Sequence, residues 1–385
     1  MCIYFLRDSR ASDLPNYFIS SIVTLNKLYL LFSIFYVDFV VTTTHNSRGL
    51  VPQENDPNTR YICKGILGEH AACLCNEDEQ EVACINAQFV DTGVFQYVNS
   101  HYSSLRRVTF HGNNFQDLPE ESLFGDTKYS SMNVLNISAN YIVNLHSNAL
   151  KAVPNIQVLD LSNNEIVLTE ANVDFLTHTP RLTHLYLRRA FTSVINRTQQ
   201  FDLLMRMFRK ANLKHLKVLD LSYNYFNMVP YDLPCPFPSI SKLDLRQNVL
   251  RTVSMNTSCL ESVDMIDLSR NHFRQLDEKF RKEFANFLPP HSLLLRNSFH
   301  CDCSSNDWVQ WVRSTDVIRE KNLLTCARSS PADFTGARLV EVPLHRLNCD
   351  TDLESNGLLN DRRFSWALII LATFLCRFVP FFAVE

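Results

Sequence analysis

Residues 156–166 read IQVLDLSNNEI, and this segment recurs along the chain in nearly the same form. Close copies are LKVLDLSYNYF at 216–226, ISKLDLRQNVL at 240–250 and VDMIDLSRNHF at 263–273. More divergent copies begin at Leu105, Met132, Leu182 and Pro289. All of them fit the template L-x-x-L-x-L-x-x-N-x-L, which predicts one stacked array of about eight repeats.

Each copy contains a short strand and a turn. Leucines two residues apart point to the same side of a strand, so they predict a core along one face of the array. The recurring asparagine follows the strand, where an amide side chain can both donate to and accept from the turning backbone. These ladder residues are Asn113, Asn140, Asn164, Asn224, Asn248, Asn271 and Asn297. Ala190 takes this place in the fourth copy, where we expect a local irregularity.

The repeat resembles that of the animal extracellular leucine-rich-repeat family, which includes Toll-type ectodomains, small leucine-rich proteoglycans and neuronal adhesion receptors. The resemblance covers roughly residues 63–349. It implies an α/β solenoid: a leucine-rich-repeat horseshoe with a parallel concave sheet, an irregular or helical convex side and a disulfide cap at both ends. Such arrays need distinct end units, because an uncapped solenoid exposes its core.

Cysteines gather at both ends of the repeats, as in oxidised secreted modules. Cys63, Cys73, Cys75 and Cys84 resemble the N-terminal flanking module of the family, with a longer first gap than usual. Cys301, Cys303, Cys326 and Cys349 resemble its C-terminal module, in which Trp308 and Trp311 cover apolar surface on a short helix. The resemblance implies the pairs Cys63–Cys75, Cys73–Cys84, Cys301–Cys326 and Cys303–Cys349. Spacing alone leaves three connectivities for each group, and zinc is the alternative ligand.

Cys235 and Cys259 lie in neighbouring repeats, where they either pair across adjacent turns or remain free thiols. The longest gap between copies, 190–215, contains the helical stripe of Phe201, Leu204, Met205 and Phe208. We expect this stripe to pack on the convex side; a groove for a partner is the alternative.

The ends of the chain are apolar. Residues 28–41 follow a lysine and precede small residues, which is typical of a secretory signal or signal anchor; a buried helix is the alternative. Residues 366–384 form a second apolar run behind a polar spacer, which favours a glycolipid-anchor signal or a spanning helix over free secretion. The expected organisation is a leader (1–44), a linker (45–62), an N-terminal cap (63–104), repeats (105–299), a C-terminal cap (300–350), a spacer (351–365) and a hydrophobic tail (366–385).

Composition and motifs narrow the function. The net charge of -3 argues against a nucleic-acid partner. No nucleophile, P-loop, zinc-protease or dinucleotide motif is present, so we predict a non-enzyme with no cofactor and no metal. Asp160, Asp220, Asp244 and Asp267 align at one strand position. Paired carboxylates can serve acid–base chemistry, but L-D-L-S is the commonest spelling of this repeat in the family, so we interpret the row as structural.

A protein partner is expected on the concave face, where Tyr and Arg are the residue types that dominate binding energy. The residues that depart from generic Asp, Ser and Asn there are His184, Tyr186, Arg188, Arg189, Tyr223, Arg246, Arg106 and Arg107. The alternative is an ordinary solvated face on which the arginines pair with the aspartate row. We centre the predicted site on the fourth repeat.

The predicted protein is a cell-surface adhesion molecule or co-receptor, lipid-anchored or single-span; a secreted matrix or decoy protein is the alternative. Three N-glycan acceptors, at Asn136, Asn196 and Asn256, fit an extracellular location. The sequence leaves the ligand and the oligomeric state open.

Overall fold

The structure is a computed structural model that describes residues 62–63, 72–100, 104–193 and 196–349. Ten strands form one sheet in chain order, from β1 (Leu74–Asn76) to β10 (Leu293–Leu294). β1 pairs antiparallel with β2 (Glu81–Ile85), and the later pairings are parallel. The intervening strands are β3 (Arg107–His111), β4 (Val134–Asn136), β5 (Val158–Asp160), β6 (His184–Tyr186), β7 (Val218–Asp220), β8 (Lys242–Asp244) and β9 (Met265–Asp267).

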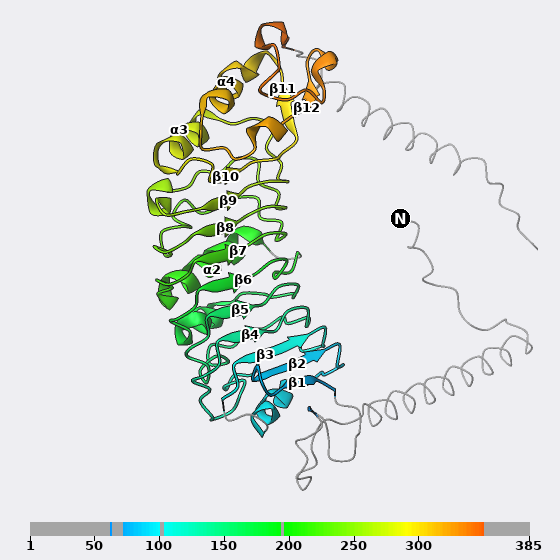
Figure 1. Cartoon of the computed structure of the whole chain (residues 1–385), viewed down its shortest axis with the longest axis vertical. Coiled ribbons are helices and arrows are strands. Elements are labelled where there is room, and N and C mark those ends of the chain that lie inside the picture. Colours follow the sequence, from blue (N-terminus) through cyan, green and yellow to red (C-terminus); the bar gives the residue numbers. More distant parts are fainter. Residues whose placement is uncertain (1–61, 64–71, 101–103, 194–195, 350–385) are drawn as a thin grey trace, which may run out of the picture.

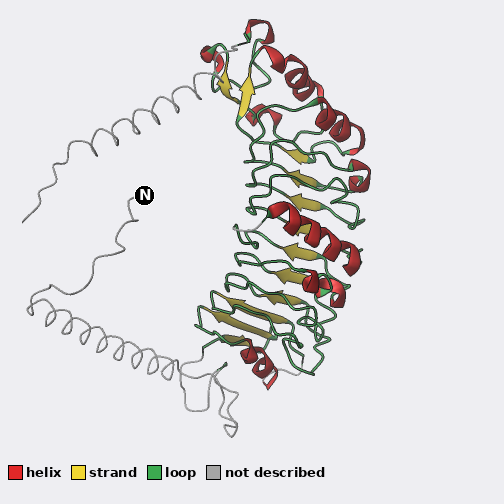
Figure 2. Cartoon of the chain, turned by 180° about the vertical axis from the view of Figure 1, so that it is seen from behind, coloured by secondary structure: helices red, strands yellow, loops and turns green. Residues whose placement is uncertain are grey.

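The strands stack as rungs along the long axis of a curved solenoid, and helices line its outer, convex margin (Figures 1 and 2). Equivalent leucines are register partners from strand to strand: Leu135 with Leu159, and Leu159 with Leu185. Each of these side chains is fully buried, so the repeats share one continuous core. The opposite face of the sheet carries the alternate residues and is the concave surface. The predicted leucine-rich-repeat solenoid with a parallel concave sheet is confirmed.

The ladder asparagines bond successive repeats to each other. Asn248 Oδ1 accepts the backbone N–H groups of Asn224 and Phe226, both at 3.0 Å, and Asn248 Nδ2 donates to the carbonyls of Leu221 and Leu245 at 3.1 and 2.9 Å. Four buried backbone groups therefore depend on one side chain. At Ala190 this rung is missing, yet β6 keeps its register with β5 and β7. The expected irregularity is confined to the ladder and to the long segment that follows.

That long segment forms α2 (Arg197–Ala211), which begins at Asn196, whose Oδ1 accepts from the N–H of Thr198 at 3.1 Å. Phe201 is buried and stacks on Phe226 of the next repeat, with ring centroids 4.3 Å apart. The stripe that begins with Phe201 packs into the common core on the side away from the exposed face of the sheet. The expected convex packing of this stripe is confirmed.

Short elements complete the convex side and the caps. The remaining α-helices are α3 (Glu278–Phe287) and α4 (Asn306–Ser314), and the C-terminal cap adds the parallel pair β11 (Phe299–Cys301) and β12 (Cys326–Ser329). The 3-10 helices are η2 (Thr92–Ser100), η3 (Glu170–Asn172), η4 (Phe175–His178), η5 (Thr257–Leu260), η6 (Cys303–Ser305), η7 (Lys321–Leu323), η8 (Ala332–Phe334) and η9 (Leu344–Arg346). On α4, Trp308 is buried against Phe299, with ring centroids 5.4 Å apart. Trp311 contacts Phe280 of α3, with ring centroids 6.2 Å apart.

Disulfides close both ends of the solenoid. The structure contains Cys63–Cys75 and Cys73–Cys84 in the N-terminal cap, and Cys301–Cys326 and Cys303–Cys349 in the C-terminal cap, the same pairs that the resemblance implies. A fifth bond joins Cys235 to Cys259, with Cα atoms 5.0 Å apart, and thus links two adjacent turns of the convex side. Of the two alternatives for this pair, the structure has the disulfide.

Candidate partner-binding surface

Most strands of the concave face from β4 to β9 end in a residue that caps its own backbone. In each case the Oδ1 atom accepts the N–H of the residue two positions later, at the end of the strand. The five residues are Asn136 (3.0 Å), Asp160 (2.8 Å), Asp220 (2.9 Å), Asp244 (3.1 Å) and Asp267 (2.9 Å). We call them the capping row. A side chain that satisfies its own backbone in this way is part of the fold.

Tyr186 interrupts the capping row in β6. Its register neighbours are Asp160 on β5 and Asp220 on β7. Burial raises the pKa of the Tyr186 phenol above its ordinary value of 10.0, and the two carboxylates raise it further. The phenol therefore stays protonated at neutral pH and keeps its hydrogen-bond donor. No capping role constrains this side chain, which is only partly buried.

His184 lies beside Tyr186 on the same strand, with ring centroids 6.3 Å apart. Its Nδ1 atom is 2.8 Å from the hydroxyl of Thr183. Burial lowers the pKa of His184 below its ordinary 6.5, and the cation of Lys217 lowers it further. The imidazole is therefore neutral at pH 7, and it extends the aromatic surface of Tyr186.

Arg188 follows the strand, and its guanidinium lies over the ring of Tyr223, 4.4 Å from the centroid. This contact joins side chains of two neighbouring repeats. We call His184, Tyr186, Arg188 and Tyr223 the central cluster. Arg189 lies next to it, exposed, in the left-handed region with φ of 48°.

The other predicted binding residues lie apart from the central cluster. Arg246 forms an ion pair with Asp244 at 3.3 Å, and Arg107 lies 3.8 Å from Glu79 of the N-terminal cap. The pair of Arg246 matches the solvated-face alternative, in which arginines pair with the aspartate row, whereas Arg107 pairs outside that row. Arg106 precedes β3 rather than lying on it. The structure brings together the residues predicted in the fourth and fifth repeats and does not join them to those in the first.

The sequence pattern marks Asp244 only as a member of the aspartate row. In the structure its side chain is buried, with 1% of the residue exposed. Burial raises its pKa to about 6, and the carboxylates of Asp220 and Asp267 on the adjacent strands also raise it, against the lowering effect of Arg246. Two residues after the aspartate, β5, β7 and β9 are followed by serine, whereas β8 is followed by Arg246. This difference is the feature of the sequence that distinguishes Asp244 from the rest of the row.

The glycan acceptors differ in exposure. Asn196 is exposed at the start of α2, and Asn256 accepts from the hydroxyl of Ser258 at 2.6 Å in a part-exposed turn. Asn136 belongs to the capping row, and the acceptor hydroxyl residue Ser138 is buried against His111 Nδ1 at 2.8 Å. Glycosylation at the three positions stays a prediction.

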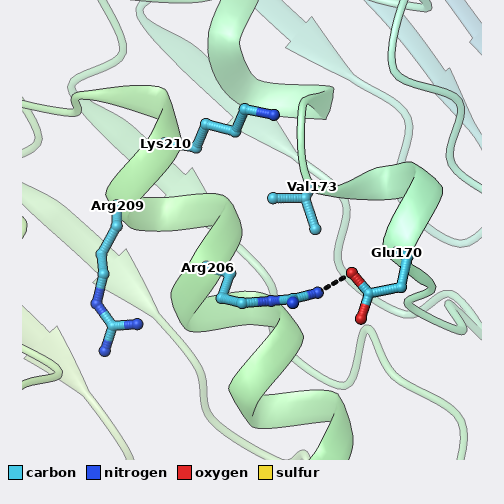
Figure 3. A pocket seen from close by; sticks show the side chains of 5 residues that line it. All are labelled: Glu170, Val173, Arg206, Arg209 and Lys210. Atoms are coloured by element: carbon cyan, nitrogen blue, oxygen red, sulfur yellow. Dashed lines mark hydrogen bonds and ion pairs between the residues drawn. The ribbon is translucent and has the colours of Figure 1, made fainter.

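A pocket of about 480 Å³ lies on the convex side between α2 and η3 (Figure 3). Its cations are paired: Arg206 with Glu170, Lys210 with Asp174 at 2.6 Å, and Arg209 with Asp232 at 2.5 Å. The pocket is therefore lined by basic side chains that are already paired with carboxylates. Within the described ranges, no group of three or more His, Cys, Asp or Glu residues could hold a metal ion.

The expectations for the chain ends fall on residues 1–61 and 350–385, which lie outside the described residues. Among the helices that the structure describes, none combines the length and the apolar character needed to cross a membrane.

Comparison with known proteins places the repeat in a family. The leucine-rich-repeat family model matches residues 130–190. Trophoblast glycoprotein of Macaca fascicularis is 26% identical over 295 residues, which cover 73% of this chain and 67% of that protein. Human Toll-like receptor 5 is 24% identical, over 70% of this chain and 29% of the receptor. The crystal structure of human trophoblast glycoprotein has a TM-score of 0.60 and 24% identity, and it covers 73% of this chain and 99% of that one.

The crystal structure of human trophoblast glycoprotein has the same solenoid fold. The two relatives are receptor-like proteins of the cell surface or membrane. Five disulfides in the described part indicate an extracellular protein. Its repeats, the family model that matches residues 130–190 and a disulfide-bonded cap at each end show a leucine-rich-repeat solenoid that is similar to the extracellular leucine-rich-repeat proteins with cysteine-rich caps.

Proposed function

We propose that this chain is a cell-surface recognition protein, an adhesion molecule or co-receptor, that binds a protein partner with the central cluster of its concave face. The proposal rests on one observation: β6 has Tyr186 at the position where the neighbouring strands have a capping aspartate. Where neighbouring strands use the equivalent side chain to cap their own backbone, β6 presents an aromatic ring that is free for other contacts.

Three properties of the central cluster support a protein partner. Tyr186 and His184 together expose apolar ring surface with polar edges, a combination enriched in protein interfaces. Arg188 is held by Tyr223, so less side-chain entropy is lost when it binds. Asp160 and Asp220 flank Tyr186 and provide acceptors beside these donors. A protein segment with alternating donors and acceptors fits this arrangement, and the relatives named above are receptor-like.

A glycan placed on β6 tests the location of the site. The full chain, expressed on mammalian cells, is first screened against an array of extracellular protein domains. Its binding is then measured after His184→Asn with Tyr186→Thr, which creates an Asn-Leu-Thr acceptor at the centre of the concave face. The matched control, Lys279→Asn with Arg281→Thr, creates an Asn-Phe-Thr acceptor on α3 of the convex side.

We expect the concave glycan to abolish binding of the partner and the convex glycan to leave it unchanged. Equal binding by both glycosylated variants would place the site elsewhere. The same cells separate the adhesion or co-receptor role from a secreted decoy, because only the former keeps the chain on the membrane.

A further inference from the structure

Three basic residues occupy equivalent positions in the last repeats, on the flank that follows the strands, and a fourth lies beside them in the C-terminal cap. Arg251, Arg274 and His300 each lie three residues after the ladder asparagine of their repeat, and His300 is the register partner of Arg328 across β11 and β12. The backbone N–H of His300 donates to the carbonyl of Arg274 at 2.8 Å. We call these four residues the basic stripe.

The backbone also connects the first two members of the basic stripe. His272 donates its N–H to the carbonyl of Leu250 at 2.8 Å, which sets the segment of Arg274 beside that of Arg251. Neighbouring strands of a sheet lie about 4.8 Å apart, so the basic stripe places its four positions over about 14 Å. This spacing is a consequence of the repeat, which returns the same position to the surface once per turn.

The basic stripe has no acidic counterpart among the residues that the structure describes. Arg251, Arg274 and Arg328 are exposed, His300 is partly exposed, and none of them forms an ion pair in that part of the chain. The carboxylates next to them in sequence have other roles. Asp277 accepts from the N–H of Phe280 at 2.7 Å and from Thr252 at 2.5 Å, and Asp302 accepts from Ser304 N–H at 2.9 Å.

Two other sets of residues show that this pattern is specific to the C-terminal end. The equivalent positions of earlier repeats are uncharged: Gln116, Val143, Val167 and Asn227. On α2, by contrast, Arg206, Arg209 and Lys210 are each paired with a carboxylate, and Figure 3 shows the pair of Arg206 with Glu170. At this position of the repeat, basic side chains without an ion-pair partner are therefore confined to the C-terminal end of the described solenoid.

We propose that the basic stripe binds a linear sulfated polysaccharide. Guanidinium groups recognise the oxygens of anionic groups with paired, directional N–H donors, and a row of them suits a chain that carries negative groups at intervals. The disulfides indicate an oxidising, extracellular setting, where sulfated polysaccharides are the abundant linear polyanions. The overall charge of -3 argues that such binding is local to this stripe rather than a property of the whole surface.

This site is separate from the central cluster. The basic stripe follows the strands of the last repeats, whereas the central cluster lies on and after β6 and β7. The two can therefore be occupied together, and loss of one should leave the other intact.

The test is binding of the purified full chain to immobilised heparin at about 0.15 M NaCl. The triple variant Arg251→Ala, Arg274→Ala and Arg328→Ala removes three positive charges from the basic stripe. The matched triple Arg206→Ala, Arg209→Ala and Lys210→Ala removes three from α2. We expect at least about tenfold weaker binding for the first and a change within about twofold for the second. Fully desulfated heparin and vesicles of anionic phospholipid serve as alternative surfaces.

An equal loss of heparin binding in both triple variants would mean that only the net charge of the protein matters, and it would overturn the proposal. Unchanged binding of the stripe variant, equal binding to desulfated heparin, or preference for the phospholipid vesicles would also overturn it. The single substitution Arg274→Ala gives a second readout that disturbs the fold less, with an expected loss of about threefold. Tyr186→Ala should bind heparin like the wild type, which distinguishes failure here from failure of the proposed function.

Discussion

The repeat of β6 and the repeats of β7 to β9 share one sheet and one core but use their polar residues differently. In β7, β8 and β9 an aspartate caps the strand end and an asparagine completes the ladder. In β6 these places hold Tyr186 and Ala190, and the strand register is nevertheless unchanged. In the regular repeats, the aspartate and the asparagine side chains bond to the backbone. The repeat of β6 lacks both side chains, and the helix α2 follows it.

The packed helix predicts the largest effect. Phe201→Ala should lower the free energy of unfolding by about 4 kcal/mol, because it empties a fully buried ring site against Phe226. Urea unfolding of the purified protein measures this loss. Asp202→Ala, on the exposed side of the same helix, should change it by less than about 0.5 kcal/mol. A small loss for Phe201→Ala would mean that α2 does not stabilise the irregular repeat.

The regular repeats are linked covalently instead. Replacing both Cys235→Ser and Cys259→Ser should cost about 3 kcal/mol, the chain-entropy value for a loop of 24 residues. Urea unfolding under non-reducing conditions gives the number. Free thiols at both positions in the wild type, found by mass spectrometry after alkylation, would contradict the assignment of this bond.

A ladder asparagine in the regular region should matter somewhat less. Asn248→Ala leaves four backbone groups without their partner, and the expected cost is about 2 to 3 kcal/mol. Asn227→Ala, in an exposed position of the preceding repeat, is the matched control and should be near neutral. If the two variants unfold at the same urea concentration, the ladder is not what holds successive turns together.

The smallest effect concerns Asp244, whose pKa burial raises to about 6 from 3.8. The folded protein therefore binds a proton there more tightly than the unfolded chain. The resulting stability is fully present below about pH 4 and is lost as pH rises through 6. Asp244→Asn, which copies Asn136 of β4, should be more stable than the wild type by about 1 to 2 kcal/mol at pH 7.5, since each pKa unit is worth about 1.4 kcal/mol and Arg246 loses its ion pair. Near pH 4 the two proteins should unfold alike; an advantage of equal size at both pH values would contradict burial of the charge.

The fold was predictable because its cause is periodic. The leucine spacing identifies the core face of each copy, and the ladder asparagines identify its turn. The stripe from Phe201 to Phe208 identifies the buried side of α2. The contacts between neighbouring repeats were not predictable from residue types. Arg188 packs on Tyr223 of the next repeat, which depends on the register of adjacent strands, whereas Arg246 pairs with Asp244 of its own repeat. The role of the central cluster in binding stays a prediction.

If the irregular repeat of β6 supplies the binding surface, substitutions in it should raise the dissociation constant of the screened protein partner. Tyr186→Ala and Arg188→Ala should each weaken binding about thirtyfold, which corresponds to the roughly 2 kcal/mol of a hot-spot residue. Their unfolding free energies should change by less than about 1 kcal/mol, because both side chains lie on the open face. Tyr231→Ala, an exposed tyrosine outside the concave face, should bind like the wild type. Wild-type affinity in both Tyr186→Ala and Arg188→Ala would contradict the account.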